Sequence, residues 1–302
     1  MPAREARRHP AGAPGRRSTP DARRNRRLWD RSSASYDRRC RGVLSGRLAE
    51  SWGLWRVPER EIGLLGPVDG ARVLELGCGG ARWSASLARR GARTVGLDQS
   101  RAQLSVARRG RGRPGSSPDL VLADAERTPF RDGAFDIVFS DYGATTFADP
   151  DRIVPEAARL LRDGGRFVFA AANPLRALTF DAKRDRQVRR LVRPYFGLGR
   201  LSLPGQMPEH TRTFAAWFDL FRRNGFVVER LLETRPDAGA RTPYLDADDD
   251  RWARRWPLEC LWSLRLDRTD PRRLAGRRSS RRPSAARRRS PAGPPAATDH
   301  KV

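Results

Sequence analysis

Short apolar runs alternate with longer segments of helical periodicity through the middle of the chain. A run of four to nine apolar-rich residues between turn-forming residues is typical of a buried strand, and the alternation with helices is typical of a parallel sheet. The strand-like runs cover residues 72–76, 94–97, 120–123, 135–140, 165–171, 226–232 and 258–266. The pattern therefore predicts an α/β domain with seven strands covered by helices.

One of the predicted helices is unusually aromatic. Thr213 is a suitable N-cap, and Gly225 stands where a helix would end. Between them, aromatic side chains recur at the spacing of one helix face: Phe214, Trp217, Phe218 and Phe221. We expect all four to pack in the core.

The two ends of the chain differ from its middle in charge. The formal net charge of the 302 residues is +26, and all but two of the 61 basic residues are arginine. Residues 1–27 and 272–302 are rich in arginine and poor in apolar residues. Such segments bury too little apolar surface to offset ordering entropy, so we predict two disordered tails. Either these tails bind nucleic acid or acidic lipid, or they are solvated segments without a binding role, whose arginine content reflects a GC-rich coding sequence.

Several other classes of protein are disfavoured. No stretch approaches the ~20 apolar residues of a membrane span, and no apolar signal region follows the first arginines. Cys40, Cys78 and Cys260 lie far apart in the sequence, which predicts neither a disulfide nor a metal site. We expect a cytoplasmic protein without a metal.

The segment VLELGCGGARW, residues 73–83, carries the clearest chemistry. Gly77 and Gly79 follow a strand and permit a tight turn with close backbone approach to a ligand. Asp98 ends the next strand, where an acidic residue accepts ribose hydroxyls. A dinucleotide site would have a third glycine where Arg82 stands. Glu75 disfavours pyrophosphate and suits a cationic ligand such as S-adenosylmethionine.

Three segments in the right order resemble class I S-adenosylmethionine-dependent methyltransferases of the ubiquinone/menaquinone small-molecule type. They are VLELGCGGARWSASLARRGARTVGLDQS, LADAERTPFRDGAFDIVFS and AARLLRDGGRFVFAA. The resemblance covers residues 28–266. It implies a Rossmann-like, mostly parallel seven-stranded sheet with an antiparallel last strand. It also implies a methyltransferase domain at 71–271, an N-terminal helical lid at 28–70 and a substrate-side insertion at 172–213.

The resemblance also assigns residues to S-adenosylmethionine. Asp98 would hold the ribose hydroxyls, with Gln99 beside the adenine. Ser140 would lie near the sulfonium, and Ala81 replaces a glycine common in the family. The methionine end would be surrounded by Glu75, Gly77, Cys78 and Gly79, the adenine edge would meet Asp124 and Ala125, and the mouth of the substrate pocket would hold Asp141 and Tyr142.

Other residues are candidates for the acceptor side. Tyr36 and Trp55 are expected to cover the methionine end, unless they anchor the N-terminal segment to the sheet. His210 is the histidine outside the predicted tails and could remove a proton from the acceptor, although a structural role is the alternative.

We therefore expect in-line methyl transfer to an oxygen, nitrogen or carbon atom of a small molecule, with the enzyme orienting the pair and excluding water. Two alternatives remain. One is an RNA or other macromolecule methyltransferase that uses the basic tails. The other is a non-catalytic nucleic-acid-binding protein on the same scaffold.

Overall fold

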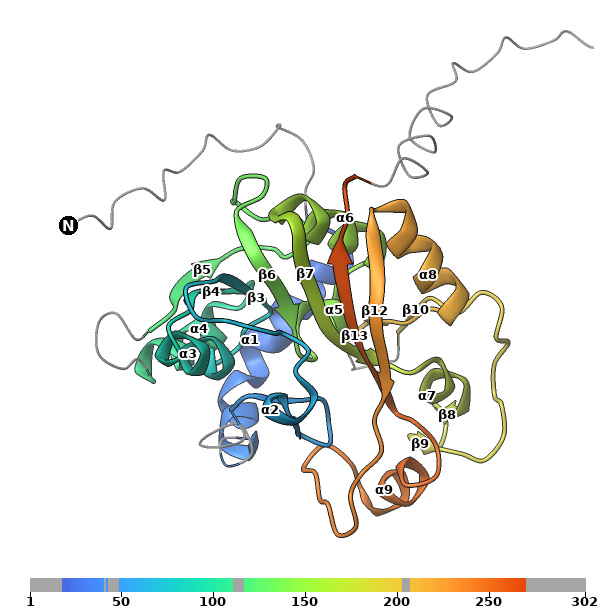
Figure 1. Cartoon of the computed structure of the whole chain (residues 1–302). Coiled ribbons are helices and arrows are strands. Elements are labelled where there is room, and N and C mark those ends of the chain that lie inside the picture. Colours follow the sequence, from blue (N-terminus) through green and yellow to red (C-terminus); the bar gives the residue numbers. More distant parts are fainter. Residues whose placement is uncertain (1–17, 41, 43–48, 111–116, 203–206, 270–302) are drawn as a thin grey trace, which may run out of the picture.

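The central element of the computed structural model is one seven-stranded sheet (Figure 1). The structure describes residues 18–40, 42, 49–110, 117–202 and 207–269. The sheet has the order β12-β13-β7-β6-β3-β4-β5. Its strands are β3 (Arg72–Leu76), β4 (Arg93–Asp98), β5 (Asp119–Leu122), β6 (Phe135–Ser140), β7 (Leu161–Ala172), β12 (Phe226–Glu233) and β13 (Glu259–Leu266).

Strand β13 alone runs against its neighbours in this sheet. It pairs antiparallel with β12 and β7, whereas the other neighbouring pairs are parallel. The predicted mostly parallel, Rossmann-like sheet with an antiparallel last strand is confirmed. The predicted bounds differ most for β7, because Leu161 already pairs with Phe135 before an irregularity in the register.

The sheet buries apolar side chains on both faces. Along β6, Val138 packs into one hydrophobic cluster, whereas Ile137 and Phe139 pack into another. Adjacent residues of a strand point to opposite faces, so a strand covered on both sides is apolar at successive positions. Helices α6 (Pro150–Leu160) and α8 (Phe214–Arg223) contribute to the first cluster, and α3 (Arg82–Arg89) contributes to the second. Helices on both faces are thereby confirmed.

Helix α8 is the predicted aromatic helix. Thr213 caps it by accepting a hydrogen bond from the Ala216 amide at 3.2 Å. Trp217 and Phe221 are buried as expected. Phe218, however, is 47% exposed, so its assignment to the core was wrong. Its ring meets Trp262 edge-on at the rim of the core, with centroids 5.6 Å apart.

Helix α1 (Pro20–Cys40) begins inside the segment predicted to be disordered. The prediction for residues 1–27 is therefore wrong from Pro20 onward, and residues 1–17 lie outside the described part, as do 270–302. Asn25 is fully buried and donates hydrogen bonds to the carbonyls of Phe147 and Pro208. Helix α1 packs against α4 (Arg101–Arg109) and α5 (Ala144–Phe147), at the edge of the candidate site.

The remaining elements are short. Before β3 come β1 (Ser51–Trp52), β2 (Val57–Pro58) and α2 (Glu59–Ile62). After β7 come α7 (Pro174–Thr179), β8 (Phe180–Asp181), β9 (Arg186–Gln187), β10 (Arg200–Leu201), β11 (Glu209–His210) and, beyond β12, α9 (Ala247–Ala253). Within the described ranges, no helix has the length and apolar character needed to cross a bilayer.

Candidate active site

The turn after β3 requires glycine at its first position. Gly77 has φ +74°, and a Cβ there would lie 2.4 Å from the Ala144 backbone nitrogen. The amides of Gly77 and Cys78 both donate to the Leu97 carbonyl, at 2.8 and 3.0 Å. The turn is thus clamped between β4 and the chain after β6, and only glycine fits.

Asp98 ends β4 and holds the far side of this turn. Its two carboxylate oxygens accept hydrogen bonds from the amides of Gly79 at 2.9 Å and Ser100 at 2.8 Å. Burial raises its pKa to about 6. A carboxylate has about four acceptor positions, so these bonds to the backbone leave capacity for a hydroxyl donor.

Glu75 is a second buried carboxyl beside the turn. It accepts hydrogen bonds from the Ser84 amide at 3.0 Å and from the Ser84 hydroxyl. Burial raises its pKa to about 8, since these two bonds only partly offset the loss of water. A cation nearby would favour the ionised form.

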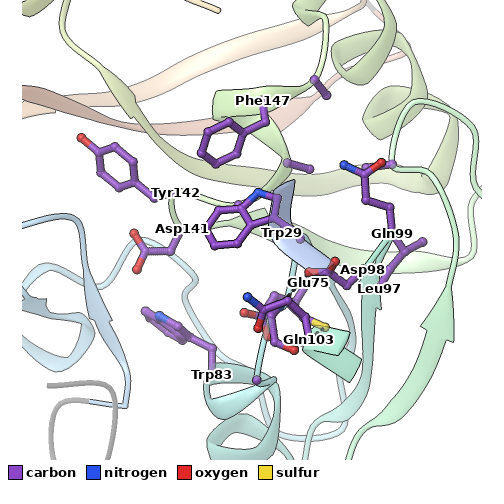
Figure 2. A pocket seen from close by; sticks show the side chains of 18 of the residues that line it. Trp29, Glu75, Trp83, Leu97, Asp98, Gln99, Gln103, Asp141, Tyr142 and Phe147 are labelled. Atoms are coloured by element: carbon purple, nitrogen blue, oxygen red, sulfur yellow. Dashed lines mark hydrogen bonds between the residues drawn. The ribbon is translucent and has the colours of Figure 1, made fainter. Parts of the chain in front are cut away.

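Both carboxyls lie at one cavity of about 1090 Å³, part of which is open to solvent. Figure 2 shows Asp141 and Tyr142 on one side of the cavity, Asp98 and Gln99 on the other, and Trp29 between them. The lining comes from the ends of β3, β4 and β6, from the chain after β5 and from α1. It includes Trp29, Tyr36, Glu75, Gly77, Cys78, Gly79, Asp98, Gln99, Asp124, Ala125, Asp141, Tyr142 and Phe147.

The comparisons with known proteins agree with this geometry. Residues 74–169 match the family described as a methyltransferase domain. A demethylmenaquinone methyltransferase of Clavibacter sepedonicus is 36% identical over 142 residues, which cover 47% of this chain and 55% of that protein. A ubiquinone biosynthesis O-methyltransferase of Agrobacterium fabrum is 32% identical over 143 residues, covering 42% and 56%.

A solved structure supports the fold. A putative S-adenosylmethionine-dependent methyltransferase from Listeria monocytogenes superposes with a TM-score of 0.57 at 22% identity, over 69% of this chain and 97% of that one. Residues 74–169 carry a methyltransferase domain, and the sheet has the fold of S-adenosylmethionine-dependent methyltransferases. This chain spans about half the length of the two curated relatives.

The methyltransferase fold and the helix that precedes it bring the predicted cofactor residues together, with one exception. All of them except Ser140 line the cavity. Ser140 is fully buried, and its hydroxyl donates to the Leu76 carbonyl at 2.8 Å. It thereby ties β6 to β3 beneath the turn, so its predicted place at the cavity is corrected.

Asp141 and Tyr142, which were predicted at the mouth of the substrate pocket, both line the cavity. Asp141 accepts hydrogen bonds from the Gly53 amide at 2.8 Å and from Arg56 at 3.1 Å, so it anchors the segment after β1 to the site. Burial raises its pKa, and the Arg56 charge opposes that rise. Tyr142 is held at φ +47°, a conformation that costs energy for a residue other than glycine.

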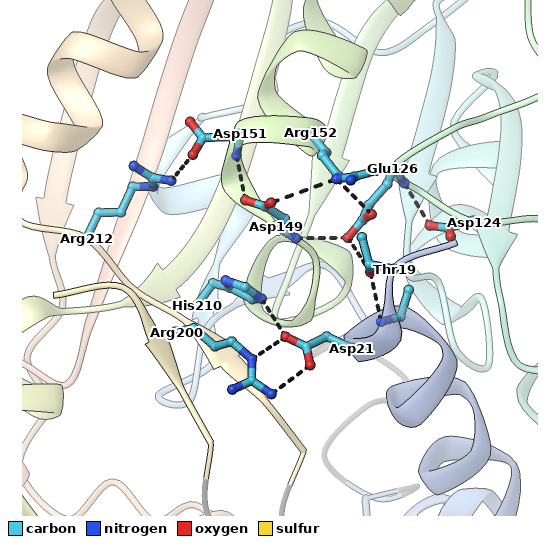
Figure 3. Close-up of polar contacts among 11 residues, drawn as sticks. Thr19, Asp21, Asp124, Glu126, Asp149, Asp151, Arg152, Arg200, His210 and Arg212 are labelled. Carbon is cyan, nitrogen blue, oxygen red and sulfur yellow. Dashed lines mark hydrogen bonds and ion pairs between the residues drawn. The ribbon is translucent and has the colours of Figure 1, made fainter. Parts of the chain in front are cut away.

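Neither His210 nor Trp55 lines this cavity. His210 Nε2 lies 3.7 Å from the Asp21 carboxylate at the start of α1, and burial lowers its pKa (Figure 3). Trp55 packs with Trp252 and Leu258 in a separate cluster. The expectation that Trp55 covers the methionine end is therefore wrong, and its alternative role as an anchor fits its burial.

Several lining residues were missed because they belong to α1 or contact it. The Trp29 ring meets Tyr36 and Phe147 edge-on, with centroids 5.3 and 5.6 Å apart. Trp29 and Tyr36 are seven residues apart, a spacing that places both on one helix face. This spacing could have predicted that Trp29 lies at the cavity together with Tyr36. No sequence pattern could have predicted the Arg82–Asp37 ion pair, which joins α3 to α1, because its partners are 45 residues apart.

Proposed function

We propose that this protein transfers a methyl group from S-adenosylmethionine to a small-molecule acceptor. The observation that carries the proposal is the convergence of Glu75, the glycine turn and Asp98 on one cavity. A cavity lined by two buried carboxyls suits a ligand that has both a cationic amino-acid end and a ribose diol. When bound, S-adenosylmethionine supplies a methyl group on a positively charged sulfur.

The cavity residues fit this cofactor. We assign Asp98 to the ribose hydroxyls, because its carboxylate keeps acceptor capacity beyond its bonds to backbone amides. Glu75 would attract the ammonium group. The remaining assignments follow the positions in the lining: Gly77, Cys78 and Gly79 at the methionine end, and Gln99, Asp124 and Ala125 at the adenine.

Helix α1 would act as the lid that excludes water. Its Asp30 accepts hydrogen bonds from the Ser100 hydroxyl at 2.7 Å and the Ala102 amide at 3.2 Å. Its Trp29 and Tyr36 place aromatic rings on the cavity. These contacts hold an apolar cover over a polar site, which is the arrangement that orients reactants in the absence of bulk water.

Two observations favour a small acceptor. One relative reported above is named for demethylmenaquinone and another for ubiquinone biosynthesis. A further relative, of Mycobacterium ulcerans, is named for phthiotriol and phenolphthiotriol dimycocerosates. A cavity covered by a helix also leaves little room for a macromolecule. Asp141 and Tyr142 line it and are our candidates for positioning the acceptor.

Isothermal titration with S-adenosylhomocysteine tests the proposal. Asp98→Asn should weaken binding by about tenfold or more, because a hydrogen bond to a charged acceptor is worth about 1.5–3 kcal/mol. Asp119→Asn, at an exposed acid in β5, is the matched control and should bind normally. Folded wild-type protein that does not bind the ligand would overturn the proposal. If the wild-type protein binds the ligand, a metabolite extract incubated with the protein and S-adenosylmethionine can be searched by mass spectrometry for a compound that has gained one methyl group, which identifies the acceptor.

A further inference from the structure

The loop between β9 and β10, residues 188–199, exposes large apolar side chains to solvent. Figure 1 shows this loop in yellow along the outer edge of the molecule, on the side of α7 and α8. The exposed fraction is 89% for Phe196, 61% for Leu191 and 39% for Tyr195. In the described part of the chain, only two other large apolar side chains are exposed, Leu122 and Phe218, and they lie on separate elements. Apolar surface concentrated in this way marks a site of binding to a protein or a membrane.

The loop is held in place from both sides. The Val192 amide donates to the Leu178 carbonyl of α7 at 2.8 Å. The Gly199 carbonyl accepts from the Thr211 amide at 3.0 Å. An ordered backbone therefore presents the apolar side chains, so little further ordering is needed when they bind.

The same loop is positively charged. Arg189 and Arg190 are exposed, and neither makes a hydrogen bond or an ion pair with a residue that the structure describes. The sequence has no acidic residue between Asp185 and Glu209. An anionic lipid surface matches this combination, because it offers phosphates to the arginines and hydrocarbon to the apolar side chains.

The geometry of the aromatic rings favours lipid over single-stranded nucleic acid. The rings of Tyr195 and Phe196 meet edge-on, with centroids 5.6 Å apart and an interplanar angle of 81°. Perpendicular rings offer no continuous face on which successive bases can stack, and Leu191 has no ring. Insertion into a bilayer does not depend on ring orientation, because hydrophobic burial is non-directional.

We propose that the loop of residues 188–199 docks this protein onto an anionic lipid surface. Phe196 and Leu191 enter the boundary between headgroups and acyl chains. Tyr195, which has an apolar ring and a polar hydroxyl, suits the headgroup region. Arg189 and Arg190 pair with lipid phosphates. This surface is independent of the proposed function, because none of these residues lines the candidate cofactor cavity.

Co-sedimentation with vesicles of phosphatidylcholine and phosphatidylglycerol in equal parts measures the apolar contribution. Leu191→Ser with Phe196→Ser should weaken binding about tenfold or more, because two large apolar side chains no longer leave water. Phe218→Ser removes an exposed ring of α8 and should bind as the wild type does. The arginine-rich ends of the chain are present in every protein compared, and circular dichroism checks that each is folded. Absent wild-type binding, or equal affinity of the two variants, would overturn the proposal.

Paired arginine variants measure the contribution of charge. Arg189→Gln with Arg190→Gln should weaken binding to the same vesicles about tenfold or more. Arg108→Gln with Arg109→Gln removes two adjacent exposed arginines at the end of α4 and should have little effect. Equal losses in the two proteins would show that only total charge matters, which contradicts the assignment to this loop.

A fluorescent label reports whether the loop enters the bilayer. All three cysteines of the chain are buried, so a cysteine introduced at the surface can be labelled selectively with nitrobenzoxadiazole. At Tyr195→Cys, the emission should shift to shorter wavelength when the anionic vesicles are added. At Phe218→Cys it should not shift. An unshifted emission at Tyr195→Cys would overturn the proposal.

Two other partners of the loop are outcomes of the same experiments. If polyuridine RNA binds the wild type, and Leu191→Ser with Phe196→Ser weakens RNA binding but not vesicle binding, the loop is a nucleic-acid surface. If size-exclusion chromatography shows a wild-type dimer that this variant abolishes without loss of vesicle binding, the loop joins two copies of the chain. Either result would overturn docking to lipid.

Discussion

Binding of S-adenosylhomocysteine should release a proton from Glu75. This carboxyl is buried, and burial raises its pKa to about 8. At pH 7 it is therefore mostly protonated in the free protein. A ligand ammonium placed beside it would favour the ionised form and lower its pKa.

The size of the effect follows from this pKa. At pH 7 a group with a pKa of about 8 is roughly 90% protonated. If the ammonium returns the pKa toward its ordinary value of 4.5, about 0.9 proton leaves on binding. Proton release favours binding as the pH rises, so affinity should increase nearly tenfold between about pH 6.5 and 7.5 and level off above about pH 8.

Calorimetry in buffers of different ionisation enthalpy measures this release directly. The slope of the observed binding enthalpy against the buffer enthalpy gives the number of protons exchanged. Glu75→Gln keeps an oxygen that can accept from Ser84 but cannot titrate, so its slope should be near zero. A wild-type slope near zero, or an unchanged slope in Glu75→Gln, would refute the reasoning.

Two further predictions concern the stability of the site, measured by chemical denaturation. Ala81 caps α3 at φ +51°, so Ala81→Gly should raise the free energy of unfolding by about 0.5–1 kcal/mol. Ala85→Gly, inside the same helix, should lower the free energy of unfolding by about 0.5–1 kcal/mol. If both variants change the free energy of unfolding in the same direction, the positive φ of Ala81 is not a source of strain. Arg56→Met leaves the buried Asp141 carboxylate without its guanidinium and should cost about 3 kcal/mol. Arg60→Met removes an exposed ion pair and should change the free energy of unfolding by less than about 0.5 kcal/mol. If Arg56→Met and Arg60→Met lower the free energy of unfolding equally, the burial of the Arg56–Asp141 pair does not matter for stability.

The sheet could be predicted because its strands are covered on both faces. Residues 72–76 and 135–140 are strands with the predicted bounds, since continuous apolar runs leave few other ways to bury them. The glycine turn could be predicted for a local reason, because Gly77 has a positive φ and no room for a Cβ. Ser140 could not, because its neighbours in sequence do not reveal that its hydroxyl bonds to Leu76 on the adjacent strand.

The start of α1 shows the opposite case. Its buried positions are small or polar, including Ala22, Asn25, Ser33 and Asp37, so no apolar stripe distinguishes it from a disordered tail. Asn25 is held by carbonyls more than a hundred residues away. A helix stabilised by such bonds carries no local hydrophobic signal.

By itself, the sequence determined the strands, the turn and the carboxylates that follow them, because backbone geometry and burial act over a few residues. Tertiary structure decided which side chains share a cavity. It brought Trp29 and Phe147 to the cavity that Glu75 and Asp98 line, left His210 beside Asp21, and gathered Asp185, Asp246 and Asp249 at a second cavity. These outcomes depend on contacts between distant segments, which the periodicity of a single chain does not encode.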